Sequence, residues 1–114
     1  DMPTPDALTV HGQTKVLEIG FSDGAQFRIP FELMRVYSPS AEVQGHGPGQ
    51  ETLVTGKQDV GIRAIEPVGA YAVRLVFDDG HDSGLYSWKY LRELADERAA
   101  RWERYLARVR EAAP

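Results

Sequence analysis

The chain has 114 residues, a length that typically forms one domain around one hydrophobic core. Its formal net charge of −4 argues against nucleic-acid binding by phosphate neutralisation, and the lack of cysteine excludes disulfides, thiolate nucleophiles and cysteine-based metal sites. No apolar run approaches the roughly 18 residues of a membrane span, and residues 1–5 resemble no signal segment, so we expect a cytoplasmic protein that binds no membrane.

The N-terminal third predicts a short β-hairpin followed by a helix. Alternating Leu17, Ile19 and Phe21 would share one face of a strand, and Pro30 suits the start of a helix because its missing N–H is not needed there. The elements expected here are a flexible tail over 1–7, strands over 8–10, 16–21 and 26–29, and a short helix over 31–36.

The C-terminal half predicts a second hairpin and further helices. Ser87 is a candidate N-cap, and the apolar positions of the last helix recur at helical spacing, so they form a stripe that packs on the domain or, alternatively, docks a partner. The expected elements are strands over 59–65, 71–77 and 84–86, a helix over 88–95 and a C-terminal helix over about 97–111 with the stripe Trp102, Tyr105, Leu106 and Val109.

The two hairpins repeat one pattern. Phe21-Ser-Asp-Gly24 precedes a helix that carries Arg35, and Phe77-Asp-Asp-Gly80 precedes a helix that carries Arg92. Asp-Gly supplies the positive φ of a tight turn, so both segments predict strand, turn, short strand and helix. We therefore predict an α+β fold over residues 8–114, with a small, mostly antiparallel sheet built from two strand-turn-strand-helix units and a C-terminal helix.

A stretch rich in glycine and proline over residues 37–56 is long for a loop in a compact domain, which makes it the first place to look for a site. It contains no lysine or arginine up to residue 56, which disfavours a phosphate cradle. We expect this loop to meet the polar turn that follows the second hairpin. The aromatic residues beside that turn would fill the core or form the wall of a groove. The candidate binding surface comprises Ser38, Ser40, Glu42, His46, Asp79, His81, Asp82, Tyr86 and Trp88.

Chemistry at these residues competes with a purely structural role. Ser87, His81 and Asp79 supply the residue types of a catalytic triad, but the sequence has no nucleophile elbow and no recognisable oxyanion donors. A divalent metal ion held by His46, His81 and Asp79 or Glu42 is a sharper alternative. Clustered polar residues at turns are frequent without chemistry, so we favour the structural role and predict no catalytic residue and no cofactor.

Three ordered motifs resemble a known family. They are LMRVYSPSAEVQGHGPGQ at 33–50, EPVGAY at 66–71 and FDDGHDSGLYSW at 77–88. Together they resemble, over roughly residues 8–95, a domain of unknown function similar to the N-terminal domain of gamma-butyrobetaine hydroxylase. In that family the domain precedes an iron(II)/2-oxoglutarate oxygenase domain, or occurs alone or attached to ATPases of the iron–sulfur carrier type. The oxygenase ligands and a P-loop are both missing from this sequence, so it resembles only the accessory piece.

The resemblance also allows the ligands of one zinc site to be compared with this sequence. The hydroxylase version of the domain binds structural zinc through a Cys-x-Cys-x-x-Cys loop and the histidine of an Asp-Gly-His motif. The matching residues here are Ser38, Ser40, Val43 and His81. Since serine and valine cannot replace thiolates, we predict that this zinc site is lost.

These observations favour a non-catalytic binding or accessory domain with a protein partner, which the family context links to iron–sulfur or metal-protein handling. A metal-binding protein or metal-dependent enzyme that uses His46 and His81 is the first alternative. A structural homo-oligomer is the second.

Overall fold

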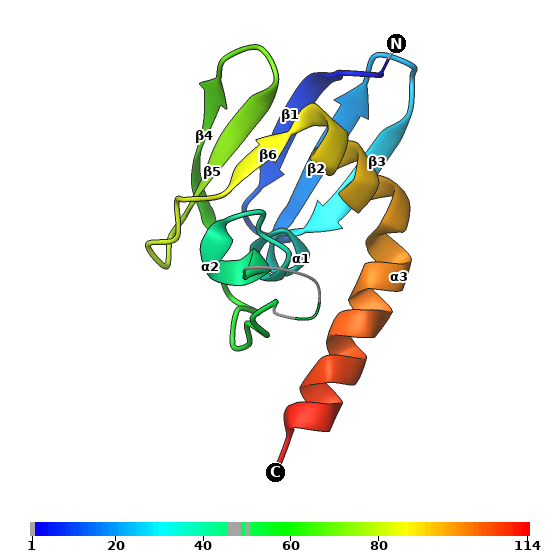
Figure 1. Ribbon diagram of the computed structural model, residues 1–114. Helices are drawn as coiled ribbons and strands as arrows, with labels where there is room; N and C mark the ends of the chain where they lie inside the picture. Colours follow the sequence, from blue (N-terminus) through cyan, green and yellow to red (C-terminus); the bar gives the residue numbers. More distant parts are fainter. Residues whose placement is uncertain (1, 46–48, 50) are drawn as a thin grey trace.

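A computed structural model describes residues 2–45, 49 and 51–114 of the chain (Figure 1). Six strands and three helices follow one another along these residues. In chain order they are β1 (Pro5–His11), β2 (Val16–Phe21), β3 (Gln26–Pro30), α1 (Phe31–Val36), α2 (Ala41–Gln44), β4 (Ile62–Val68), β5 (Ala72–Phe77), β6 (Leu85–Ser87) and α3 (Trp88–Ala112).

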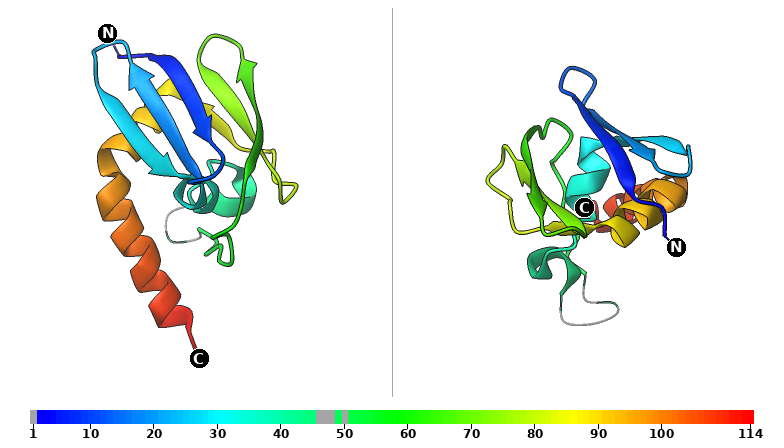
Figure 2. Two further views of the ribbon diagram at one scale, coloured as in Figure 1. Left: turned by 180° about the vertical axis from the view of Figure 1, so that it is seen from behind. Right: turned by 90° about the horizontal axis from the view of Figure 1, so that it is seen from above.

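The strands form two three-stranded antiparallel sheets, in the orders β1-β2-β3 and β4-β5-β6. Each sheet is a meander that leads directly into a helix, α1 after the first sheet and α3 after the second. The predicted α+β class with two strand-turn-strand-helix units is therefore confirmed. The predicted strands divide between two sheets, and the C-terminal half of α3 extends beyond both of them (Figures 1 and 2).

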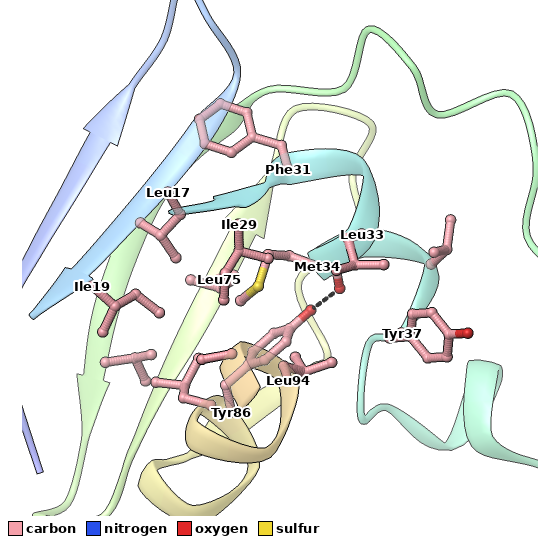
Figure 3. Close-up of a cluster of buried hydrophobic side chains, with 14 of the residues drawn as sticks. Leu17, Ile19, Ile29, Phe31, Leu33, Met34, Tyr37, Leu75, Tyr86 and Leu94 are labelled. Atoms are coloured by element: carbon pink, nitrogen blue, oxygen red, sulfur yellow. Dashed lines mark hydrogen bonds between the residues drawn. The ribbon is translucent and has the colours of Figure 1, made fainter. Parts of the chain in front are cut away.

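The core lies between the sheets and helices (Figure 3). In the middle strands, β2 and β5, every second side chain is buried, as the period of a strand with one buried face requires. Helices α1 and α3 add apolar side chains to the same cluster. Its largest fully buried members are Leu17, Ile19, Phe21, Ile29, Phe31, Leu33, Met34, Leu75, Phe77, Tyr86, Leu91 and Leu94.

The predicted repeat of the two Asp-Gly turns is present in the structure. The N–H of Gly24 donates to the carbonyl of Phe21 over 2.9 Å, and the N–H of Gly80 donates to that of Phe77 over 3.2 Å. The two glycines have φ angles of 90° and 91°, values that favour glycine because it has no Cβ. The same backbone turn therefore follows β2 and β5.

The two units are tied together by crossed ion pairs. Arg35 of α1 bonds Asp79 in the second turn over 2.8 Å, and Arg92 of α3 bonds Asp23 in the first turn over 3.1 Å. Each unit therefore supplies the arginine that neutralises the aspartate of the other unit. We call these contacts the crossed Asp–Arg pairs.

Several predicted boundaries were wrong, and pairing within the sheets explains two of them. Strand β1 begins at Pro5, so residues 5–7 belong to a strand and not to the tail expected over 1–7; Pro5 pairs with Phe21 and Ala7 with Gly20. Strand β4 runs through Pro67 into the predicted turn because it is an edge strand, where a proline need not donate to a neighbour.

The last two predicted helices are one. Helix α3 is continuous from Trp88 to Ala112, and the expected interruption between residues 95 and 97 does not occur. No glycine or proline stands in this segment to end the helix. The predicted N-cap is confirmed, since the Ser87 hydroxyl accepts from the N–H of Tyr90 over 3.0 Å. Tyr105 of the predicted stripe is buried, and Trp102, Leu106 and Val109 pack against the core.

Candidate functional site

A buried serine–histidine cluster joins the 37–56 segment to the turn after β5. The Nε2 atom of His81 lies 2.8 Å from the Ser38 hydroxyl and 3.4 Å from the Ser40 hydroxyl, and the Ser40 N–H also donates to the Ser38 hydroxyl. All three residues are buried, and the His81 side chain is 4% exposed. The structure thus brings together Ser38, Ser40 and His81, which we call the Ser–His cluster.

The packing around this cluster leaves little space. A Cβ on Gly84 would lie 2.4 Å from the Ser38 hydroxyl, a separation that no real side chain tolerates. On the other side of the imidazole, a Glu42 carboxylate oxygen lies 3.6 Å from Nδ1, and the Ser83 hydroxyl donates to the same carboxylate. Glu42 remains largely exposed and lies at the edge of the cluster.

The surroundings of His81 favour its neutral form. Burial is the main cause that lowers the pKa of its imidazole, and the positive charge of Arg35 acts in the same direction. The carboxylates of Glu42, Asp79 and Asp82 oppose this shift without reversing it. A neutral imidazole can share one hydrogen bond with a serine hydroxyl whichever tautomer it adopts.

Asp79 belongs to a separate ionic cluster beside the histidine. Its carboxylate bonds Arg35 and Lys57, each over 2.8 Å, and accepts from the His81 N–H over 3.0 Å. Partial burial opposes ionisation, but the bonds from Lys57, the His81 amide and Arg35 hold the pKa of Asp79 well below its usual range. The Nη1 atom of Arg35 is buried without a hydrogen-bond partner among the residues that the structure describes.

The candidate aromatic residues occupy different places. Tyr86 is fully buried, and its hydroxyl donates to the carbonyl of Met34 over 2.5 Å (Figure 3). Trp88 packs against the core, and its Nε1–H donates to the carbonyl of Ala70 in the loop between β4 and β5. These two side chains serve packing, whereas neighbouring Tyr90 lines a pocket described below.

The remaining candidates are exposed or undescribed. Asp82 is exposed beside the Ser–His cluster. His46 lies outside the described residues, so the structure gives no distance between it and His81. Within residues 2–45, 49 and 51–114, no three histidine, aspartate or glutamate side chains lie close enough to hold a metal ion. Ser87 caps α3 while His81 bonds Ser38 and Ser40, so the hydrogen bonds that a triad would need are committed elsewhere.

Two cations at this site were not among the sequence candidates. Arg35 could have been found from the repeated pattern, because Arg92 occupies a similar position in the helix after the other turn. Lys57 gives no such signal, since it lies in an irregular segment that only the tertiary fold brings to Asp79.

The two repeated units, joined by crossed ion pairs, define an internally repeated α+β domain. The chain belongs to the family described as "Gamma-butyrobetaine hydroxylase-like, N-terminal", whose model matches residues 8–92. The resemblance inferred from the three sequence motifs is thereby confirmed.

Solved structures support the same relationship. A protein with an NMR solution structure is 56% identical, with a TM-score of 0.86, over 98% of this chain and 83% of that one. A second NMR structure is 46% identical, with a TM-score of 0.83, over 98% and 88% of the two chains. A crystal structure from Acidithiobacillus ferrooxidans, of a protein with unknown function in the DUF971 family, is 37% identical, with a TM-score of 0.68, over 81% and 92%.

No curated protein matches the chain significantly. Across the described part of the chain, none of the helices combines the length and the apolar character that crossing a membrane requires.

Proposed function

We propose that the protein is a non-catalytic binding module whose recognition surface surrounds the Ser–His cluster. The observation that carries this proposal is the commitment of His81, the residue best suited to acid–base chemistry here, to two buried serines. A general base must reach its substrate, and an imidazole 4% exposed with its Nε2 bonded to Ser38 does not. In this role His81 fixes the loop against the turn.

The exposed part of the surface is acidic. Glu42 and Asp82 flank the cluster, and Asp78 stands exposed at the start of the same turn. Ion pairs hold Asp79 internally. Glu42 and Asp78 accept from the Ser83 hydroxyl and the Gly61 N–H, but like Asp82 they stay exposed, so all three charges can face a partner. We call Glu42, Asp78 and Asp82 the acidic rim. Complementary charge speeds encounter and rejects wrong partners, so the expected partner is a protein with a basic contact surface.

The family resemblance supports one class of partner. The occurrence of related domains beside iron–sulfur carrier ATPases favours a cytoplasmic partner that handles iron–sulfur clusters or metal proteins. The chain's own cluster supplies one imidazole and two neutral hydroxyls, whereas structural zinc uses thiolate, imidazole or carboxylate ligands. We therefore assign the metal-handling step to the partner and the recognition step to this chain.

Pull-down experiments with charge-reversal variants test the proposal. Glu42→Lys/Asp82→Lys should lose the partners that wild type enriches, while Asp6→Lys/Glu111→Lys, an equal charge change at exposed carboxylates elsewhere, should retain them. If both variants retain the same partners, the acidic rim is not the recognition surface.

Two further measurements separate the alternatives. Copurified metal, or a rise in melting temperature on addition of Zn²⁺, Fe²⁺ or Mn²⁺, would support a metal-binding protein in place of this proposal. A molar mass of two or more chains in light scattering, unchanged by the rim variants, would support the structural homo-oligomer.

A further inference from the structure

A concave site lies between α3 and the segment that follows α1. It has a volume of about 210 Å³, and its walls include Tyr37, Glu51, Tyr90, Arg101, Arg104 and Arg108, so three arginines face one acidic residue. The Ser–His cluster and the acidic rim contribute none of these residues. We call this site the arginine pocket.

The spacing of the three arginines places them together. Arg101, Arg104 and Arg108 stand at i, i+3 and i+7, so they share one face of α3. The guanidinium carbon of Arg101 lies 5.1 Å from the centre of the Tyr37 ring and 5.6 Å from that of Tyr90. That of Arg104 lies 5.8 Å from the Tyr37 ring. The aromatic faces thus hold the planar cations in the pocket.

Hydrogen bonds from their hydroxyl groups hold the side chains of both tyrosines in place. The Tyr37 hydroxyl donates to the carbonyl of Arg101 over 2.8 Å, and the Tyr90 hydroxyl donates to the carbonyl of Tyr37 over 2.5 Å. Two ordered rings therefore form one wall of the pocket, and less side-chain entropy is lost when a ligand binds to a wall that is already ordered.

The positive charge of the pocket is only partly compensated. Arg101 bonds Glu97 over 3.1 Å, and Arg108 donates to the backbone carbonyl of Glu51 over 3.2 Å. Glu51 itself lines the pocket, so it offsets part of the arginine charge. Among the residues that the structure describes, neither Arg104 nor Arg108 forms an ion pair with a carboxylate. Arg35 and Arg92, in contrast, both have acidic partners, in a chain whose net charge is −4.

We propose that the arginine pocket binds a small ligand through an oxyanion group, either a carboxylate or a phosphoryl group. Guanidinium matches both groups because its N–H donors form two parallel bonds to paired oxygens. The volume corresponds to about seven water molecules at roughly 30 Å³ each, which accommodates one such group and its immediate substituents. It is smaller than a typical pocket for a drug-sized molecule, of about 300–1,000 Å³.

NMR titration of the intact chain at low salt tests this assignment, with inorganic phosphate and succinate as separate probes. At least one probe should produce saturable shifts in the amides of residues 101–108 and Tyr37. Saturation by phosphate alone identifies a phosphoryl ligand, and saturation by succinate alone identifies a carboxylate ligand. Shifts that rise linearly for both probes, without saturation, would overturn the proposal.

Matched variants locate the binding. Arg104→Gln/Arg108→Gln should weaken binding at least tenfold, whereas Arg63→Gln/Arg110→Gln, which removes two exposed arginines elsewhere, should leave it unchanged. If both variants weaken anion binding equally, the effect arises from the overall charge of the protein, and the proposal that the arginine pocket is the binding site is wrong. Arg104→Lys/Arg108→Lys keeps the charge and lacks the planar fork, so an intermediate loss is expected even if the glutamine variant folds poorly.

The outcome is independent of the recognition surface proposed above. Glu42→Lys/Asp82→Lys should bind the anion as wild type does, because neither residue lines the pocket. Anion binding can therefore fail while rim-dependent partner capture succeeds, and the reverse also holds.

Discussion

Replacement of Asp79 by asparagine tests the ionic cluster beside the histidine. Asparagine keeps the shape of the side chain and the oxygen that accepts from the His81 N–H, so the turn itself can persist. It removes the negative charge between Arg35 and Lys57, each 2.8 Å from the carboxylate. The side chains of Asp79 and Arg35 are only 18% and 11% exposed, so water replaces the lost partner poorly.

The size of the effect follows from these contacts. A hydrogen bond to a charged group contributes about 1.5–3 kcal/mol net. Lys57 and Arg35 both stabilise the ionised carboxylate, and water screens part of each contribution. We therefore expect Asp79→Asn to lower the free energy of unfolding by about 2 kcal/mol. With an unfolding entropy of about 2.1 cal/mol/K per residue, 1 kcal/mol corresponds to about 4 °C in this chain, so the melting temperature should fall by about 8 °C.

Scanning calorimetry and a double-mutant cycle with Arg35→Met provide the assay. The two changes should be clearly non-additive, since each removes the same bond. Asp23→Asn is the matched control, because Asp23 occupies the equivalent turn. The Asp23 side chain is 40% exposed, so this change should lower the free energy of unfolding by a smaller amount. Additive effects at Asp79 and Arg35, or an equal loss at Asp23, would refute the reasoning.

At low pH the difference in melting temperature between wild type and Asp79→Asn should disappear. The folded-state pKa of Asp79 lies below the ordinary value of 3.8, so its contribution is present above about pH 4. As the pH falls through the folded pKa the carboxylate becomes protonated, and the two melting temperatures should converge. A constant difference down to the acid limit would contradict the assignment.

Three further changes probe the cluster and the α3 N-terminus. Because the pKa of His81 is lowered, wild type should lose stability as the pH falls below about 6.5, and His81→Gln should show a flatter dependence between pH 5 and 7 in thermal melts; equal slopes would contradict a neutral buried imidazole. Ser87→Ala removes the N-cap bond and should cost about 1 kcal/mol in urea unfolding, whereas an unchanged midpoint would deny the cap a stabilising role. Gly84→Ala places a Cβ 2.4 Å from the Ser38 hydroxyl and should cost about 1–3 kcal/mol by the same measurement. Gly12→Ala, where a Cβ meets nothing within 4 Å, is its control and should leave the midpoint near that of wild type; equal effects would remove the steric explanation.

Local patterns were sufficient to predict most of the fold. The alternation in β2, the proline before α1 and the serine before α3 act over a few residues, and the structure retains all three. The errors arose where pairing between strands determines where a strand begins or ends. Pro5 lies in a strand because it pairs with Phe21, and Pro67 does so because β4 has one free edge.

The site was less predictable, because its contacts span large sequence separations. Ser38 and His81 are 43 residues apart, and only the family motifs placed them together. The pairing of Asp79 with Lys57 has no local signature at all. The arginine pocket was not predicted. The spacing of Arg101, Arg104 and Arg108 can be read from the sequence, but the aromatic wall comes from Tyr37, 64 residues before Arg101 in the chain.

The crossed Asp–Arg pairs make the protein resemble a dimer whose two subunits share one polypeptide. Arg35 completes the turn at Asp79, and Arg92 completes the turn at Asp23, so neither unit is self-sufficient. Damage in one unit therefore removes support from the other, which couples the unfolding of the two. The segment between α1 and β4 acts as the tether that keeps the two partners at high effective concentration. It also supplies Ser38 and Lys57, which contact the second unit at His81 and Asp79, so it links the two units by contact as well as by covalent connection.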